Sequence, residues 1–115
     1  MGIIANERQA GGAIILELSG RLYLGESSDE LDQRLQGLIN EAKVNLILNC
    51  SGVSAIDSQG IKVLVRSVIS AHKRGGKVAL LKISNRVRDV LTITRLLSVI
   101  ESFDDEQAAL ASFPS

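Results

Sequence analysis

The fold is decided by the stretch Asn49-Cys-Ser-Gly-Val-Ser-Ala-Ile-Asp57-Ser58-Gln59-Gly60-Ile61. It follows a short apolar run over residues 44–48, which predicts a buried central strand, and it leads into a helical pattern over residues 60–74. We therefore expect Ser58 at, or next to, the N-terminus of that helix. Unpaired backbone N–H groups and the positive end of the helix dipole favour anions at such a place. A hydroxyl there is either a helix cap or the site of a switch.

The segments on either side of this stretch alternate between strand and helix patterns. Before it, apolar runs at residues 3–6 and 13–19, separated by Gly11-Gly12, predict a β-hairpin. Ser27 and Glu30 have the spacing of a capping box, which predicts an amphipathic helix over residues 28–41. The elements expected after the stretch are, in order, a helix stop at Gly75-Gly76, a strand at 78–81, a helix begun by Ser84 or Asn85, a short strand at 99–100 and a helix near 104–111, with Phe103 and Phe113 packed on the core.

This order of elements predicts an α/β fold with one mixed β-sheet of four to five strands and about four helices. No linker, repeat or low-complexity segment interrupts the pattern, so we expect a single domain over residues 1–115. In open α/β sheets, functional groups gather in the loops that follow the carboxyl ends of strands. The loop that contains Asp57 and Ser58 is expected to be such a loop.

The composition excludes several classes of function. Thirteen basic residues balance 13 acidic ones, so the net positive field that attracts nucleic acids or anionic membranes is missing. The single cysteine, Cys50, cannot form an internal disulfide, which favours a reducing compartment. No signal peptide and no apolar run of about 18 residues is evident, so we expect a cytoplasmic protein without membrane insertion.

A longer motif extends over residues 45–61, which read Asn45-Leu-Ile-Leu-Asn-Cys-Ser-Gly-Val-Ser-Ala-Ile-Asp-Ser-Gln-Gly-Ile61. It is followed by the strand at Lys77, the segment Ile83-Ser-Asn-Arg-Val-Arg-Asp-Val-Leu91 and the acidic, alanine-rich tail Asp104-Asp-Glu-Gln-Ala-Ala-Leu110. In this order the segments resemble the STAS family, named for sulfate transporters and anti-sigma factor antagonists, and in particular its small single-domain bacterial members. The resemblance covers essentially the whole chain.

The resemblance implies that the chain is an anti-anti-sigma factor and not an enzyme. In such members, the serine after the aspartate is phosphorylated by a partner anti-sigma factor that is also a serine kinase. The unphosphorylated form captures this kinase and frees the sigma factor. In this chain the phospho-acceptor would be Ser58, with Asp57 before it and Gly60 after it. A phosphatase acting on phospho-Ser58 would reverse the switch.

Two residues depart from the pattern of the family. Gln59 stands where the family usually has serine or threonine, so a second hydroxyl is lost while the acceptor remains. Tyr23 stands where an aspartate is common in the family, so a polar contact between that aspartate and a partner cannot be expected in this chain. The identity of the partner, the sigma factor and the oligomeric state therefore stay open.

A partner surface is expected on the outward side of the second helix and the loop before it. Helical spacing places Ile61, Leu64, Val65, Val68, Ile69, Ala71 and His72 on one side, which we assign to the core, and leaves Lys62, Val63, Arg66, Ser67 and Ser70 on the other. The residues predicted to bind the partner are Asp57, Ser58, Gln59, Gly60, Lys62, Val63 and Arg66.

Three alternative interpretations compete with the switch. Ser58 could simply cap the helix. The chain could be a STAS scaffold subunit of a signalling assembly or of a lipid transport system, without a phospho-switch. An enzyme with Ser58 as nucleophile would need a base, but the single histidine, His72, lies about 20 Å away along the same helix.

The sequence offers no cofactor, metal or catalytic cluster. His72 has no second histidine or nearby cysteine with which to bind a metal. The glycine pairs do not match a phosphate-binding loop. Asn85, Arg86, Arg88 and Arg95 could hold an anion at the third helix, but such residues more often form a solvated face.

Overall fold

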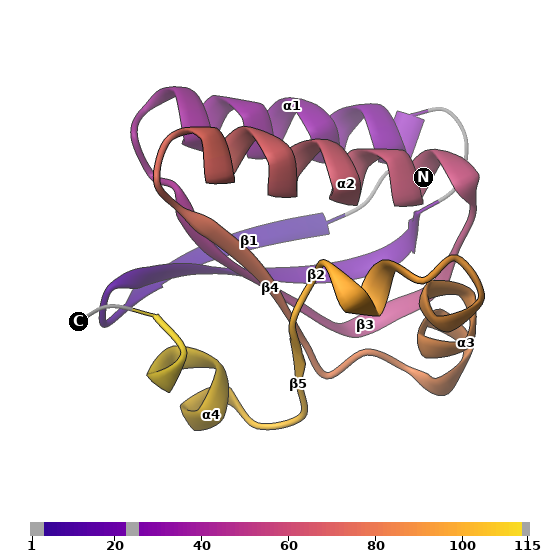
Figure 1. Cartoon of the computed structure of the whole chain (residues 1–115). Helices are drawn as coiled ribbons and strands as arrows, with labels where there is room; N and C mark the ends of the chain where they lie inside the picture. The colour runs from indigo at the N-terminus through magenta and orange to yellow at the C-terminus, as the bar shows by residue number, and fades with distance from the viewer. Residues whose placement is uncertain (1–3, 23–25, 114–115) are drawn as a thin grey trace.

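The chain folds into a five-stranded sheet with helices on both faces (Figure 1). The computed structural model describes residues 4–22 and 26–113. The elements within these ranges are β1 (Ile4–Ala10), β2 (Ala13–Leu22), α1 (Glu26–Asn40), β3 (Asn45–Ile56), α2 (Ser58–Lys73), β4 (Lys77–Leu81), α3 (Asn85–Ile93), a 3-10 helix (Leu96–Ser98), β5 (Ser102–Phe103) and α4 (Glu106–Ala111). The predicted fold class is confirmed.

The sheet is mixed, and its strands are adjacent in the order β1-β2-β3-β4-β5. β1 and β2 form an antiparallel hairpin, whereas β2, β3, β4 and β5 run parallel to one another. Gly11 adopts a φ of +57° in the hairpin turn, a conformation that side chains disfavour. The hairpin is confirmed, and both of its strands extend further than the residues 3–6 and 13–19 that the sequence predicts.

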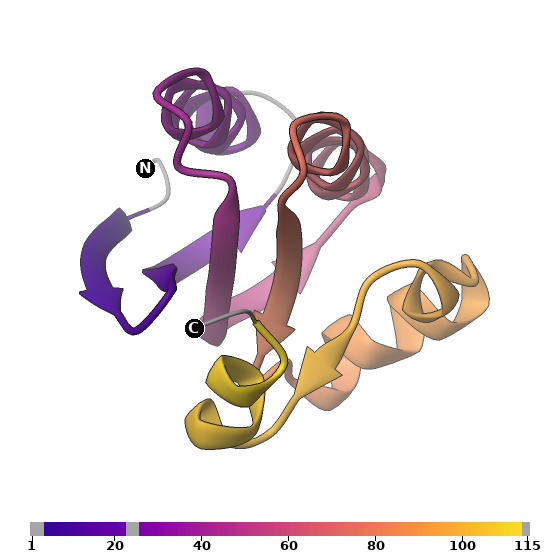
Figure 2. The ribbon, with the colours of Figure 1, turned by 60° about the vertical axis from the view of Figure 1, so that its left-hand side comes forward.

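The helices divide the buried side chains into two cores. α1 and α2 lie side by side on one face of the sheet, and α4 lies on the opposite face (Figure 2). The larger core contains alternate residues of the central strands, such as Leu46, Leu48 and Leu80, together with residues of α1, α2 and α3. The smaller core contains Ile47 and Ala79 together with Phe113, and Phe103 packs against it. The predicted packing of both phenylalanines is confirmed.

A charged network ties α4 to the hairpin on this second face. Arg8 donates hydrogen bonds to Glu17, at 2.7 Å, and to Glu106. The bond from Arg8 lowers the pKa of the Glu106 carboxyl below its usual value, and the two carboxylates raise the pKa of Arg8. The amide of Asn49, which is 7% exposed, donates to the other carboxylate oxygen of Glu17. The network therefore connects β1, β2, β3 and α4.

The largest difference between a predicted and an observed boundary is at the end of β3. The strand was predicted over residues 44–48, but it continues to Ile56. Its second half pairs with β2, and the register shifts between Glu17 and Ser19 and again after Gly20. Gly52 permits this close pairing, because a Cβ atom there would lie 2.7 Å from the carbonyl oxygen of Leu18. The loop before the second helix is therefore reduced to Asp57.

Two smaller boundaries also differ from the prediction, and a third agrees with it. α1 begins at Glu26, so Ser27 is the second residue of the helix and does not precede it as predicted. Residues 99–100 follow the 3-10 helix and are not a strand; the last strand is β5 instead. The third helix is capped as expected, because the hydroxyl of Ser84 accepts a hydrogen bond from the backbone N–H of Val87 at 3.2 Å.

The predicted core side of α2 is partly wrong. Val63 and Ser67, which were assigned to the outward side, are 8% and 0% exposed, and the Ser67 hydroxyl donates to the carbonyl oxygen of Leu64 at 2.7 Å. Ile69, which was assigned to the core, is 50% exposed, and His72 is also exposed. The buried residues of α2 are Gly60, Val63, Leu64, Ser67 and Ala71. The helix is thus rotated relative to the predicted orientation.

The glycine pair ends α2 as predicted, and each glycine has a separate role. Gly75 adopts a φ of +83°. Gly76 packs against the backbone of Val44, whose carbonyl oxygen also accepts a hydrogen bond from the Lys77 N–H at 2.9 Å. A Cβ atom at Gly76 would overlap the carbonyl oxygen and the Cβ of Val44. The turn into β4 therefore requires glycine at residue 76.

We expect Gly76→Ala to lower the free energy of unfolding by about 3 kcal/mol, because backbone and strand must shift to accommodate the methyl group. The matched control is Gly37→Ala in α1, where a Cβ atom would meet nothing within 4 Å. That change should raise the free energy of unfolding by about 0.5–1 kcal/mol. Urea denaturation followed by circular dichroism measures both values. Equal effects of the two substitutions would contradict the tight packing at residue 76.

Candidate functional site

Ser58 is the first residue of α2, directly after the carboxyl end of β3. Asp57 caps the helix: its Oδ1 atom accepts hydrogen bonds from the backbone N–H groups of Gln59 and Gly60, both at 3.1 Å. The prediction that Ser58 lies at a helix N-terminus is confirmed. The cap itself is Asp57, so the side chain of Ser58 is not needed for that purpose.

The side chain of Ser58 is exposed, and Gln59 beside it is partly exposed. A hydroxyl in this position can be reached by another protein without opening the core. The helix dipole favours negative charge here. However, the Asp57 carboxylate already accepts the N–H groups of Gln59 and Gly60, so an anion on Ser58 would lie beside a second anion. A negative group on Ser58 would therefore be attracted by the dipole of α2 and repelled by the Asp57 carboxylate.

The seven residues predicted to bind a partner fall into two groups. Ser58, Lys62 and Arg66 are exposed, and Asp57 and Gln59 are partly exposed. Gly60 and Val63 are buried. The prediction that Val63 projects outward is wrong, because α1 packs against that flank of α2 and Val63 belongs to the larger core.

A groove lies between α1 and α2 and includes Gln59, the residue that follows Ser58. It encloses about 310 Å³ and is lined by Ser28, Asp29 and Asp32 of α1 and by Gln59, Lys62, Val63 and Arg66 of α2. An ion pair between Arg66 and Asp32, with a nitrogen–oxygen distance of 3.3 Å, crosses it. Asp29 and Asp32 were not among the predicted site residues. The sequence did contain a signal for them. Asp29 and Asp32 are three residues apart in one predicted helix, and Lys62 and Arg66 are four residues apart in the next, so each pair lies on one side of its helix.

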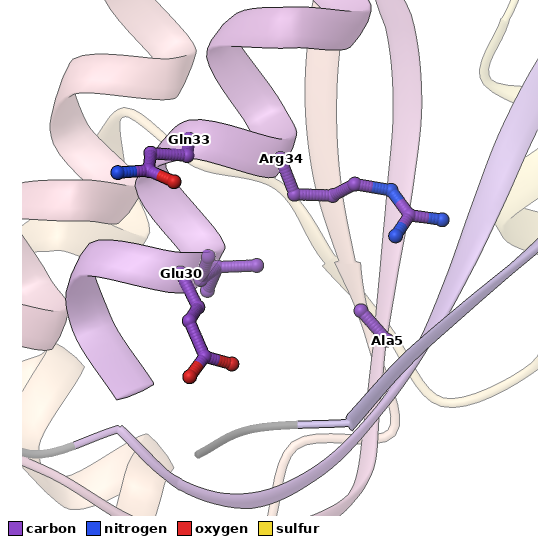
Figure 3. A pocket seen from close by; sticks show the side chains of 5 residues that line it. Ala5, Glu30, Gln33 and Arg34 are labelled. Atoms are coloured by element: carbon purple, nitrogen blue, oxygen red, sulfur yellow. The ribbon is translucent and has the colours of Figure 1, made fainter. Parts of the chain in front are cut away.

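A second hollow lies on the other side of α1, next to the hairpin (Figure 3). It encloses about 500 Å³ and is lined by Ala5, Glu30, Leu31, Gln33 and Arg34. Figure 3 shows Arg34 reaching from α1 toward the sheet beside Ala5, and its guanidinium pairs with Glu7 at 3.4 Å. These lining side chains contain no hydroxyl or thiol, so this hollow offers no acceptor for a serine kinase.

The described residues do not assemble other chemistry around Ser58. His72 lies in the last turn of α2, about 20 Å along the helix axis from Ser58. Cys50 is 4% exposed, and burial raises the pKa of its thiol to about 12, so the thiol stays protonated at neutral pH. Within residues 4–22 and 26–113, no three histidine, cysteine or carboxylate side chains are grouped so that they could hold a metal ion.

The four residues considered as an anion site at α3 are not brought together. Asn85 and Arg86 lie at the start of the helix, whereas Arg95 follows its end, about 15 Å away along the axis. Arg88 pairs with Asp104 at 3.4 Å. Tyr23, the other departure from the family pattern, lies outside the described residues. Of the helices that the structure describes, none has the length and apolar character needed to cross a bilayer.

Comparison with known proteins identifies one family. The family model described as "STAS domain" matches residues 5–109, which is most of the chain. No curated protein matches the sequence.

Solved structures of similar fold include proteins from three groups of bacteria. A candidate anti-sigma factor antagonist from Thermotoga maritima is 23% identical and has a TM-score of 0.88, with 94% of this chain and 92% of that chain covered. An anti-sigma factor antagonist from Mycobacterium paratuberculosis is 18% identical, with a TM-score of 0.85 and coverage of 96% and 93%. The Bacillus cell fate determinant SpoIIAA in its phosphorylated form is 17% identical, with a TM-score of 0.73 and coverage of 95% and 98%. At these identities the likeness shows a shared fold.

Proposed function

The chain belongs to the STAS domain family, and from this premise we propose that it is an anti-anti-sigma factor that is switched off by phosphorylation of Ser58. In its unphosphorylated form it captures an anti-sigma factor that is also a serine kinase, and so frees the sigma factor. Phosphorylation by that kinase ends the capture, and a phosphatase acting on phospho-Ser58 restores it. The role requires the cytoplasm, where sigma factors act.

The observation that carries this proposal is the exposed hydroxyl of Ser58 at the start of α2. A kinase must align the hydroxyl with the γ-phosphate of ATP, so the acceptor has to project from the surface. Ser58 meets this requirement, and a phosphate on it would leave the core packing of α2 unchanged because the buried residues lie on the opposite side of the helix. The fold can therefore be the same in both states.

The switch acts through charge and bulk at the surface. A phosphate adds between about 1.5 and 2 negative charges at pH 7. It would lie next to the Asp57 carboxylate, which is held in place by its bonds to Gln59 and Gly60. A partner that packs over Ser58 in the unmodified state would then meet two neighbouring anions and a bulky hydrated group. Such contacts disfavour association.

The proposed partner surface is revised by the structure. Asp57, Ser58, Gln59, Lys62 and Arg66 keep the contact role predicted for them, and Asp29 and Asp32 join them across the groove. Gly60 and Val63 support this surface from the buried side of α2 and do not contact the partner through exposed side chains.

A phosphorylation assay tests the proposal. The Ser58→Ala chain, which cannot be modified at residue 58, serves as bait to recover the kinase. That kinase, incubated with ATP and the unmodified chain, is expected to transfer one phosphate to Ser58, located by mass spectrometry. Ser54→Ala is the matched control, because Ser54 is also exposed and lies four residues before Ser58. It should be phosphorylated as fully as the unmodified chain.

A purified complex that contains no kinase, or a kinase that leaves Ser58 unmodified, would contradict the switch. The chain would then be better described as a STAS scaffold subunit of a signalling assembly or of a lipid transport system. A competition assay adds an independent measurement. Unphosphorylated chain should displace sigma factor from the anti-sigma factor, and the phosphorylated chain should not.

A further inference from the structure

The most exposed large hydrophobic side chain among the described residues is that of Ile93, the last residue of α3, at 81%. α3 buries Val87 and Leu91 in the larger core. Asp89 is exposed and lies one turn before Ile93, on the side of the helix opposite the two buried residues. Figure 1 shows α3 at the margin of the fold, away from α4. An apolar side chain is therefore presented to solvent at the edge of the molecule.

Two arginines flank Asp89 and Ile93 along the chain. Arg86 lies one turn before Asp89 on α3, and Arg95 follows the end of the helix. Both arginines are exposed. Within the described residues, the side chains of Arg86, Asp89 and Arg95 have no ion-pair partner. We name Arg86, Asp89, Ile93 and Arg95 the α3 patch.

The charged residues that adjoin the α3 patch in the chain have partners elsewhere. Arg88 pairs with Asp104 at 3.4 Å. Lys82, before the helix, interacts electrostatically with Glu106 of α4. Glu101, after the 3-10 helix, pairs with the lysine that begins β4 at 2.7 Å. The α3 patch thus contains one unpaired carboxylate between two unpaired guanidinium groups, with an exposed isoleucine among them.

We infer that the α3 patch is a homodimer interface, in which two copies of the chain associate about a twofold axis with Ile93 of one copy against Ile93 of the other. This inference does not depend on the function proposed above. A twofold interface brings the same surface of both copies together, so that surface has to be complementary to itself. The α3 patch meets this condition because it has an apolar centre and charges of both signs.

The spacing along α3 makes two patches complementary when the two helices run antiparallel. Asp89 lies about 6 Å before Ile93 along the helix axis, and the backbone of Arg95 lies about 3 Å after it. A twofold axis at Ile93 therefore brings Asp89 of each copy within reach of the long side chain of Arg95 of the other copy. The two ion pairs would lie on either side of the isoleucines and form the polar rim of the contact. Arg86 lies on the far side of Asp89, so each carboxylate is shared by two guanidinium groups.

Charge favours a second copy over other partners of this surface. The formal net charge of the chain is zero at pH 7, so two copies do not repel each other at long range. An acidic partner would meet the Asp89 carboxylate within the patch, and a basic partner would meet Arg86 and Arg95. A surface with the same alternation of charge matches all three residues, and the chain itself supplies such a surface. Because the contact is small, we expect a weak dimer whose population rises with protein concentration.

Cysteine cross-linking tests the contact at Ile93 directly. Cys50, the single cysteine of the chain, is 4% exposed, so a cysteine introduced at the surface provides the accessible thiol. A disulfide requires two Cβ atoms about 3.5–4.5 Å apart. With copper–phenanthroline as the oxidant, Ile93→Cys should form a disulfide-linked dimer at least about 10-fold faster than Ile69→Cys, because the dimer raises the effective concentration of the second thiol. Ile69, on α2, is the matched control because it is also exposed, at 50%.

Sedimentation equilibrium measures the affinity of the dimer. Ile93→Asp should weaken dimerisation at least about 30-fold, and Asp89→Arg, which brings like charges together, about 10-fold. Combining Asp89→Arg with Arg95→Asp reverses the ion pair and should restore the affinity to within about 3-fold of the unmodified chain. Residue 95 has a φ of +62°, which aspartate tolerates. Thermal melting should be similar for all these variants, since none of the three side chains is part of either core.

Four results would overturn the inference. The first is a chain that stays monomeric up to its solubility limit, and the second is a dimer that Ile93→Asp leaves intact. The third is faster cross-linking of Ile69→Cys than of Ile93→Cys, which would place the contact on α2. The fourth is a monomeric chain in which Ile93→Asp weakens capture of the anti-sigma factor kinase, which would assign the patch to that partner. A charge reversal that fails to restore the dimer would contradict the antiparallel arrangement. Phosphorylation of Ser58 is measured separately, so the proposed function stands or fails independently.

Discussion

Phosphorylation of Ser58 is expected to weaken capture of the anti-sigma factor kinase about 100-fold, equivalent to about 2.8 kcal/mol of binding free energy. Like charges brought together at an interface cost several kcal/mol. Here the new dianion adjoins Asp57, whose carboxylate is held by two backbone N–H groups and cannot turn away without uncapping α2. The loss should appear mainly as faster dissociation.

The measurement compares four forms of the chain by surface plasmon resonance. Ser58→Ala should bind as tightly as the unphosphorylated chain, the phosphorylated chain should bind about 100-fold more weakly, and Ser58→Asp, with one smaller charge, should lose about 10-fold. Raising the ionic strength from 0.1 M to 1 M shortens the Debye length from about 10 Å to about 3 Å. The difference between phosphorylated and unphosphorylated chain should then shrink. Equal affinities at low salt would contradict a surface switch at this residue.

Val63→Asp is expected to destabilise the domain by about 4 kcal/mol. Val63 is 8% exposed and belongs to the larger core, between α2 and its neighbours. The substitution removes an apolar side chain from that core and buries a carboxylate without an assigned partner. An outward-facing residue would tolerate the same change, so this variant distinguishes the observed orientation of α2 from the one that the sequence predicts.

The matched control is Lys62→Asp, one residue earlier on the exposed side. It should change the free energy of unfolding by less than about 0.5 kcal/mol, as surface substitutions generally do. Urea titration monitored by circular dichroism gives both values. If Val63→Asp melted within a degree or two of the unmodified chain and lost only partner binding, the burial described for Val63 would be wrong.

Local signals in the sequence predict much of the fold and the position of the candidate site. The apolar runs and the glycine pair at Gly11-Gly12 predict the hairpin, and Gly75-Gly76 predicts the end of α2. The start of α2 is predicted to within two residues, because Asp57 and Ser58 both favour helix N-termini. These features depend on the conformational preferences of a few residues that are neighbours in the sequence, so the sequence is sufficient to predict them.

Features that depend on tertiary pairing were not predicted. α2 has apolar residues on most sides, including Ile61, Val63, Leu64, Val65 and Ile69, so periodicity alone permits two orientations. The position of α1 on the flank of Val63 decides between them. Similarly, the serines and Gly52 in the second half of β3 read as a loop, and only the pairing with β2 makes that segment a strand. The carboxylates of Asp29 and Asp32 join the site because two helices pack together.

The location of α4 has a practical consequence for every binding experiment described above. Phe113, two residues after α4, is buried in the smaller core, on the face of the sheet opposite α1 and α2. The described part of the chain therefore ends on the face of the sheet opposite α2, and a linker added after Phe113 starts from that face. A chain immobilised through such a linker exposes α2 to the solution. Immobilisation through the exposed amine of Lys62 would instead block the surface of α2.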